Sequence, residues 1–290
     1  MRTETDLQLA ASNLNAELVN QLGDKTIDIA LVLGSGLGGL GGLGGLIANS
    51  AIDTILERAY KDIPGMPESS APTHDGLLKI IKTESQHLLI FQGRFHLYEG
   101  HSARDAAATS YLSHLLGAKQ IIFTNAAGGL NPELTPGDIM LVNDHINFTG
   151  QSPLIGHNDA GLGVRFPDMS RAYNQTLQTH AISTAANLNI PLAQGIYAGV
   201  TGPELETSAE RRHMRAAGCD AIGMSLVMET IGAVHCGLEV MALSAITNVA
   251  TGAPDQPADT IETVLANAAI AAKKLEHLLP SIIQGLAAKK

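Results

Sequence analysis

The chain has 290 residues, of which 45% are hydrophobic and 16% are charged, and its formal net charge is -10. This composition is typical of a globular protein with a large core and not of a disordered one. The acidic balance, without any Lys/Arg cluster, excludes a nucleic-acid-binding surface. The polar amino-terminus and the absence of 18 consecutive apolar residues predict a soluble, cytoplasmic protein. Cys219 and Cys236 lack metal-ligand spacing, so we expect small core residues in a reducing compartment and no metal site.

The first half of the chain alternates between helical and strand patterns. Leucines at near-helical spacing predict a leading helix, and a polar turn separates two apolar runs that read as paired strands. Ser102 and Asp105 have the spacing of a helix cap, and Gly117 marks the end of that helix. We predict helices over 6–22 and 102–116, and strands over 29–33, 51–57, 77–82, 87–91 and 120–124.

The second half continues the alternation without a linker. We predict strands over 139–146, 193–200 and 239–247 and a short one near Ala221, with helices over 170–186, 207–218, 228–236 and 259–286. The polar, proline-containing run 147–167 is too long for an ordinary connection, which favours a functional loop or one that contacts a neighbour. The pattern predicts a single α/β domain over 1–290, with a central mixed β-sheet surrounded by helices.

A glycine-rich stretch follows the predicted strand 29–33. Glycines at the end of a buried strand let an anion approach backbone N–H groups, so Gly34, Ser35 and Gly36 suggest a phosphate cradle, although a plain tight turn has the same pattern. The spacing Gly34-x-Gly36-x-x-Gly39 also fits a dinucleotide fingerprint, which leaves a dehydrogenase as an alternative. Three Gly-Gly-Leu triplets over 38–46 should weaken any helix there, and we assign them no function.

Unusual polar residues follow several of the predicted strands, where ligands bind in open α/β sheets. One group offers donors suited to a dianion: Ser35, His74, Arg94, His96, the Ala126 amide and Ser225. Tyr98 and Met224 offer an amphipathic surface for a sugar, whereas Glu206 and Asn248 could bind the polar edge of a heterocycle. Phosphate, sugar and base are the parts of a nucleoside phosphorolysis, in which phosphate itself attacks the anomeric carbon.

Six ordered blocks resemble the signatures of the trimeric purine nucleoside phosphorylases, from about residue 29 to the end of the chain. They are LGSGLG at 33–38, QGRFHLYEG at 92–100, TNAAGG at 124–129, GPELET at 202–207, GMS at 223–225 and ITN at 246–248. The resemblance implies the phosphorylase/hydrolase-like α/β fold and a homotrimer. It also implies phosphorolysis of 6-oxopurine (deoxy)ribonucleosides such as inosine and guanosine, giving free purine and (deoxy)ribose 1-phosphate in purine salvage.

The same resemblance implies a role for each matching residue, with inorganic phosphate as co-substrate, no cofactor, and no nucleic-acid or membrane partner. Asn248, Glu206 and His96 would be catalytic, with His96 at the phosphate–ribose side. Asn248 would hydrogen-bond N7 of the leaving purine, and Glu206 would accept from N1–H of a 6-oxopurine. The phosphate would be held by Ser35, His74, Arg94, Ala126 and Ser225, the ribose by Tyr98 and Met224, and the purine by Glu206, Asn248 and Leu205.

Three positions depart from the family pattern. Leu205 stands where an aromatic residue usually stacks on the purine, Leu162 where an aromatic residue crosses to the neighbouring subunit, and Ile261 where a histidine commonly lies near the ribose 5′-hydroxyl. Ile261 favours a methylthioadenosine-type phosphorylase, but Asn248 opposes it because those enzymes resemble a pattern with Asp there. A dinucleotide-dependent dehydrogenase and a catalytically silent nucleoside-binding protein remain as further alternatives.

Overall fold

The computed structural model of the chain describes residues 4–22, 27–34, 37, 53–71, 74–254, 256 and 260–287. Its strands form one nine-stranded sheet in the order β2-β3-β4-β1-β5-β8-β7-β6-β9. Because β9 also pairs with β5, the strands from β5 to β9 in this order close on themselves. The strands are β1 (Ile29–Leu33), β2 (Asp53–Ala59), β3 (Leu77–Lys82), β4 (His87–Gln92), β5 (Gln120–Gly129), β6 (Ile139–Asn147), β7 (Ala193–Gly199), β8 (Ala221–Gly223) and β9 (Glu239–Val249).

The pairing directions confirm the predicted mixed sheet. Strand β1 runs parallel to both β4 and β5, and β5 runs parallel to β9. The hairpins at the sheet edge are antiparallel, as are the β5–β8 and β6–β9 pairs. As a result, the carboxyl ends of β1, β4, β5 and β9 lie at the same edge of the sheet.

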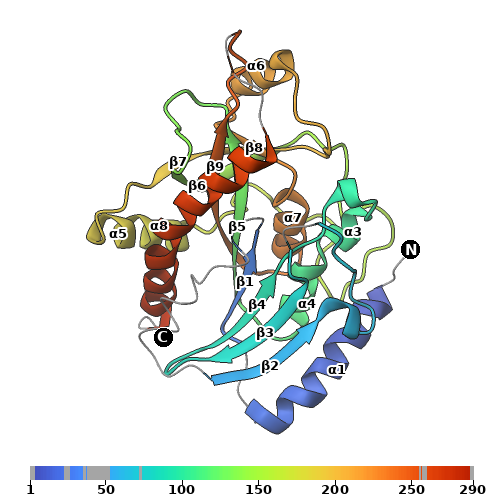
Figure 1. The fold of residues 1–290 in the computed structure, drawn as a ribbon. Helices are drawn as coiled ribbons and strands as arrows, with labels where there is room; N and C mark the ends of the chain where they lie inside the picture. Colours follow the sequence, from blue (N-terminus) through green and yellow to red (C-terminus); the bar gives the residue numbers. More distant parts are fainter. Residues whose placement is uncertain are drawn as a thin grey trace.

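Helices cover both faces of the sheet (Figure 1). Residues of α1, α3, α4 and α7 pack in the core on one face, while residues of α5 and α8 pack in the core on the other. The helices are α1 (Glu4–Leu22), α3 (Ala103–Ala106), α4 (Ala108–Leu115), α5 (Gln175–Asn187), α6 (Ser208–Ala216), α7 (Val227–His235) and α8 (Ile261–Ala287), and η1 (Tyr60–Asp62) and η2 (Leu97–Glu99) are 3-10 turns.

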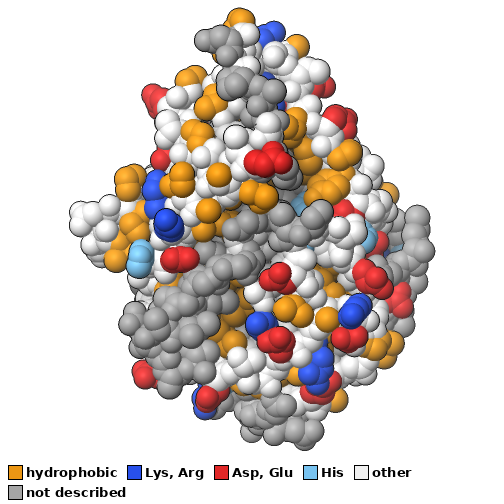
Figure 2. Space-filling view, in the orientation of Figure 1, with side chains coloured by type: hydrophobic (Ala, Val, Ile, Leu, Met, Phe, Trp, Pro, Cys, Tyr) orange, Lys and Arg blue, Asp and Glu red, His pale blue; other side chains and the backbone are white. Residues whose placement is uncertain are grey.

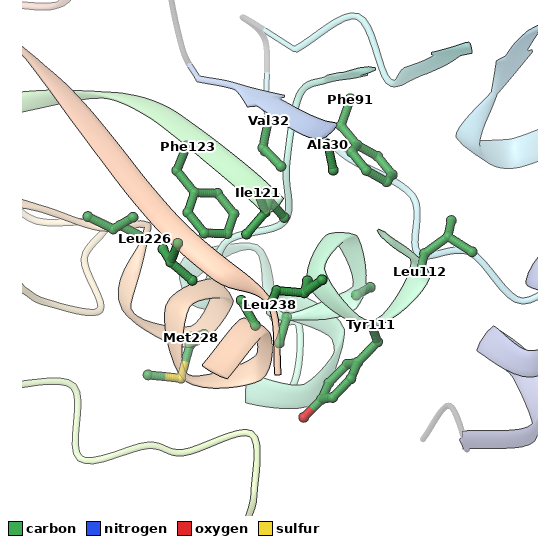
Figure 3. Packing of buried hydrophobic residues seen from close by; sticks show 14 of the residues in the cluster. Ala30, Val32, Phe91, Tyr111, Leu112, Ile121, Phe123, Leu226, Met228 and Leu238 are labelled. Carbon is green, nitrogen blue, oxygen red and sulfur yellow. The ribbon is translucent and has the colours of Figure 1, made fainter. Parts of the chain in front are cut away.

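Strand β1 shows that the sheet is buried on both faces. Its residues alternate between the two cores, with Ala30 and Val32 on the α4/α7 side and Ile29, Leu31 and Leu33 on the α5/α8 side. Figure 3 shows Val32 and Phe123 of adjacent strands near the helices that carry Tyr111 and Met228. A continuous apolar run without polar alternation is therefore the pattern of a fully buried strand.

Most predicted elements are confirmed, with shifts at their ends. The predicted helix 102–116 is two helices, α3 and α4, because Ala107 leaves the helical conformation with φ -94° and ψ 5°. The predicted helix 170–186 begins only after Asn174, whose side chain accepts hydrogen bonds from the N–H groups of Thr176 and Leu177. The predicted strand 51–57 is observed as β2, two residues later.

The positions of two polar residues need a larger correction. The predicted strands 120–124 and 239–247 put Asn125 and Asn248 just after a strand, but both residues lie inside the longer strands β5 and β9. These strands continue because they pair with each other up to Gly129 and Val249, past an irregularity after Ala127.

Some expectations stay predictions. The Gly-Gly-Leu triplets 38–46 lie outside the described residues. The single domain expected over 1–290 also stays a prediction. Within the described part of the chain, no helix combines the length and apolar character needed to cross a membrane. The cytoplasmic location expected from the sequence is untested.

Candidate functional site

A cavity of about 680 Å³ opens at the carboxyl ends of the strands. Its walls come from Gly34 directly after β1, the loop after β4, and the last residues of β5 and β9. The β8–α7 connection and the first turns of α8 complete them. The lining residues are Gly34, Ala71, Arg94, His96, Tyr98, Asn125, Ala126, Ala127, Gly128, Leu205, Ile222, Gly223, Met224, Ser225, Thr247, Asn248, Val264 and Leu265.

This lining brings together most of the residues predicted from the sequence: Arg94, His96, Tyr98, Ala126, Leu205, Met224, Ser225 and Asn248. His74 lies behind the lining, with its ring stacked on that of His96 at a centroid distance of 5.1 Å. Glu206 lies next to Leu205 but outside the lining, and its carboxylate pairs with Arg211 at 3.6 Å. Ser35 lies outside the described residues.

Arg94 is the buried cation of the site, with 1% of the residue exposed. Its Nη2 donates to the carbonyl oxygens of Val32 and Thr124, and its Nη1 lies 3.3 Å from the Glu229 carboxylate. Neither Nε nor Nη1 makes a hydrogen bond to any described residue. A buried donor without a partner is costly, so this edge of the guanidinium is suited to an anion in the cavity.

His96 is oriented by Glu99, which the sequence analysis did not single out. The Glu99 Oε1 atom accepts the His96 N–H and lies 2.9 Å from Nδ1. This leaves Nε2 as the ring nitrogen for a bound molecule. Glu99 Oε2 accepts from the N–H and hydroxyl of Ser70. Burial alone would raise the pKa of Glu99, but the hydrogen bonds from His96 and Ser70 outweigh it and hold this pKa well below its usual range.

Three rings form a stack at one side of the cavity. His96 lies between His74 and Tyr98, and the His96–Tyr98 centroids are 4.6 Å apart. Burial, followed by the charges of His96 and Arg94, lowers the pKa of His74 to about 3. His74 Nδ1 lies within hydrogen-bond distance of both the Arg94 N–H and the Arg94 carbonyl oxygen, at 3.2 and 3.1 Å, which fixes the ring beside Arg94 and leaves Nε2 for a ligand.

Two glycines allow the close approaches that build this side of the site. A Cβ on Gly34 would lie 2.6 Å from the Thr124 carbonyl oxygen, so only glycine lets the end of β1 lie against β5. Gly93 has φ +121°, and a Cβ there would lie 2.8 Å from the His74 Cβ. The turn that places Arg94 against His74 therefore requires glycine.

The opposite side of the cavity combines an amide with apolar side chains. The Thr247 hydroxyl donates to Asn248 Oδ1 at 3.0 Å, which orients the amide so that Nδ2 can donate to a ligand. Leu205, with 51% of the residue exposed, and Val264 and Leu265 of α8 are the apolar part. This arrangement can bind a flat heterocycle while a donor contacts its edge.

The two other unusual positions have different outcomes. Leu162 is 5% exposed and packs in the core of its own chain. The side chain of Ile261 lies outside what the structure describes. Sequence reasoning missed Val264 and Leu265 in the first turns of α8, for which the local pattern gave no signal. It also missed Glu99, whose spacing from His96 is that of a cap.

The site attracts an anion locally and not through a charged surface. On the face seen in Figure 2, Lys and Arg side chains are scattered among Asp and Glu, and the described residues there form no broad basic patch. No group of three or more His, Cys, Asp or Glu within the described ranges could hold a metal ion.

Comparison with known proteins places the chain in a family. The model of the phosphorylase superfamily matches residues 28–284. Purine nucleoside phosphorylase 1 of Bacillus subtilis is 44% identical over 242 residues, which cover 83% of this chain and 86% of that protein. Crystal structures of Schistosoma purine nucleoside phosphorylases in complex with hypoxanthine (31% identity, TM-score 0.83) and of Schistosoma mansoni with adenosine (30% identity, TM-score 0.84) each cover 99% of both chains. The chain thus belongs to the phosphorylase superfamily and, within it, to the purine nucleoside phosphorylases.

Proposed function

We propose that this enzyme cleaves 6-oxopurine (deoxy)ribonucleosides, inosine and guanosine, with inorganic phosphate. The products are the free purine and (deoxy)ribose 1-phosphate, as purine salvage requires. One observation carries this proposal: the buried Arg94 has an unpaired Nε at a cavity that also contains Asn248. An anion-binding group and a donor for a heterocycle thus lie in one cavity, as phosphorolysis needs.

The phosphate is held by Arg94, His74, the Ala126 N–H, Ser225 and Ser35, a set of donors that matches a dianion. Tyr98 and Met224 contact the ribose. The transition state has oxocarbenium character, so the phosphate stabilises the positive charge that develops on the sugar while it attacks the anomeric carbon. His96 lies between these two groups, with Glu99 fixing its orientation.

The leaving purine gains electrons as the glycosidic bond breaks. A hydrogen bond from Asn248 Nδ2 to N7 becomes stronger as this charge develops, so it lowers the barrier more than it favours substrate binding. Glu206 accepts from N1–H, which a 6-oxopurine has and adenine lacks, and its carboxylate also lies 3.6 Å from Arg211 Nε. Leu205 covers the base in place of an aromatic ring. The reaction needs no cofactor, because phosphate is the nucleophile.

The test follows base release from inosine, guanosine, adenosine and methylthioadenosine, each with and without phosphate. We expect inosine and guanosine to be cleaved only with phosphate, and adenosine poorly. Cleavage without phosphate, or a clear preference for adenosine, would refute the proposal. The family match is to phosphorylases, so it gives the dehydrogenase alternative no support. A catalytically silent protein would release no base in any of these mixtures.

A second candidate is a methylthioadenosine- or methylthioinosine-type phosphorylase. It is favoured by Val264 and Leu265, two apolar side chains of α8 that line the cavity and could contact an apolar 5′ group. Methylthioadenosine differs from inosine both at the base and at the 5′ position, so methylthioinosine is added to the assay to separate the two differences. Cleavage of methylthioinosine at the rate of inosine indicates tolerance at the 5′ position. Faster cleavage of methylthioadenosine than of inosine favours the second candidate.

We also propose that the chain forms a homotrimer. The support is that several large apolar side chains of the segment after β6 are exposed in the single chain, where a partner subunit would cover them. They are Phe148, Ile155, Val164 and Phe166, the last with 87% of the residue exposed. Sedimentation equilibrium should give three times the chain mass of 30.3 kDa, and a monomer would contradict this assembly.

A further inference from the structure

Glu229 of α7 is a buried carboxylate that the proposed reaction does not use. Only 2% of the residue is exposed, and it does not line the cavity. It lies behind Arg94, with Oε2 3.3 Å from Nη1 in an ion pair whose side chains are both almost fully buried. Burying two charges is costly unless their geometry is well defined, so this pair is expected to have a specific role.

The same carboxylate holds the turn that precedes α7. Its Oε2 atom accepts the Leu226 N–H at 3.1 Å, and its Oε1 atom accepts the hydroxyl of Thr109 on α4 at 3.3 Å. One side chain therefore connects the loop after β4, the start of α7 and α4.

The turn itself has an unusual conformation. Leu226 has φ 68° and ψ -50°, and the Val227 N–H donates to the Ser225 carbonyl oxygen at 2.7 Å. This is a classic-type γ-turn, which is strained for a residue with a side chain and persists only where its surroundings hold it. The buried Leu226 side chain (Figure 3) and the Glu229 carboxylate provide those restraints. The residue just before Leu226 is Ser225, which lines the cavity.

Glu229 also limits which donors of Arg94 remain for an anion. Two carbonyl oxygens accept from Nη2, and the Glu229 carboxylate lies 3.3 Å from Nη1. Neither Nη1 nor Nε makes a hydrogen bond to a described residue, and of the two Nε has no ion-pair partner there. Without the carboxylate, Nη1 would lose its charged neighbour and the guanidinium could rotate about its side-chain bonds.

We propose that Glu229 is a positioning residue that holds two donors on separate elements, Arg94 and Ser225, in one phosphate-binding geometry. This inference rests on the proposed function, in which both residues bind phosphate. It assigns to Glu229 an effect on phosphate affinity and not on the affinity for the purine.

Three variants separate this role from a general effect on folding. Glu229→Gln keeps the shape, since the amide oxygen can take the Oε2 position and the amide nitrogen can donate to Thr109, but it removes the charge. Glu229→Ala removes both. Ser110→Ala is the matched control, because the Ser110 hydroxyl donates to the Glu229 backbone carbonyl at 2.7 Å and its loss leaves the carboxylate in place.

The measurements are the KM for phosphate, the KM for inosine, and the Kd of inorganic phosphate without nucleoside by calorimetry. We expect the phosphate KM and Kd to rise about 10-fold or more in Glu229→Ala and about 3-fold in Glu229→Gln, as the loss of a charged hydrogen bond predicts. The KM for inosine should stay within about twofold of wild type in both Glu229 variants. In Ser110→Ala, both KM values and the phosphate Kd should stay within about twofold of wild type.

Equal changes in both KM values, or a phosphate KM within twofold of wild type in both Glu229 variants, would overturn the inference. If Glu229→Ala does not fold, Glu229→Gln and its control still decide the question. Failure of the proposed function is a different result, since wild-type enzyme would then cleave inosine without phosphate or not at all.

Discussion

Asn248 is the residue on which the proposed chemistry depends most. Its amide is oriented by Thr247, and Gly128 leaves the space it occupies, since a Cβ there would lie 3.3 Å from Nδ2. We predict that Asn248→Ala lowers kcat for inosine by about 10²-fold or more, the cost of removing one donor to a developing charge, with a much smaller rise in KM. Steady-state kinetics with saturating phosphate measure both. An unchanged kcat would remove Asn248 from the mechanism.

His74 should make the stability of the protein depend on pH. Its pKa is lowered by burial to about 3, so between this value and its unfolded pKa the unfolded chain binds more protons than the native state. The contribution of the neutral His74 ring to the free energy of unfolding is fully present above the unfolded pKa of about 6.5, and it is lost as the pH falls towards about 3. From pH 7 to 5.5, His74 should reduce the free energy of unfolding by about 1 kcal/mol.

The comparison of wild type with His74→Gln isolates this effect, because His114 and His145, whose pKa values burial also lowers, are present in both. Urea unfolding at the two pH values gives the free energies. The variant should lose about 1 kcal/mol less than wild type on acidification. Parallel losses would show that His74 does not remain neutral in the folded protein.

At the scale of elements, β8 places Met224 and Ser225, and it depends on Gly223. A Cβ on Gly223 would overlap the hydroxyl of Tyr197, which belongs to the adjacent strand β7. We predict that Gly223→Ala destabilises the protein by about 1–3 kcal/mol, the usual cost of overpacking, and weakens phosphate binding because Ser225 moves. Thermal unfolding and the phosphate KM measure the two effects.

Tyr197→Phe supplies the control for this element. It removes the overlapping atom, so the double variant should be less destabilised than the sum of the single variants. Tyr197→Phe alone loses the 3.4 Å hydrogen bond from the Ser225 N–H and the contact of the Tyr197 hydroxyl with the Ser225 side chain. Additive effects would mean that the overlap with Tyr197 is not the cause.

The elements also show which features of the fold could be predicted from the sequence. Strand β1 and the need for glycine at position 34 could be predicted, because a buried apolar run followed by glycine is a local pattern. The placement of Asn125 after a strand was wrong, since β5 continues by pairing with β9 and β8, both far along the chain. Glu229 gave no signal for the same reason: its partner Arg94 follows a different strand, and nothing in the sequence near α7 indicates that pairing.

At the scale of the whole molecule, the closure of β5 to β9 with one another gathers the site from distant segments. Strands β5 and β9 each contribute polar residues to the cavity, and β8, between β5 and β7, carries the turn with Ser225. The cavity thus combines residues of rigid, hydrogen-bonded strands with residues of the loops that follow β4 and β8. The candidate anion donors Arg94 and Ser225 lie in these loops, so they form a local group of donors in a molecule whose net charge is negative.

That opposition predicts how salt affects the reaction. The formal net charge of -10 repels phosphate at long range, whereas Arg94, 1% exposed, attracts it at short range. Added salt shortens the Debye length from about 30 Å at 0.01 M to about 10 Å at 0.1 M, which screens the repulsion more than the buried attraction. We therefore expect kcat/KM for phosphate to rise by about 1.5- to 3-fold over this range at pH 8, where most of the phosphate is the dianion. Chloride and acetate salts must give the same trend, and the KM for neutral inosine, the internal control, should not change. A fall in kcat/KM for phosphate in both salts would mean that exposed cations, and not Arg94, dominate the capture of phosphate.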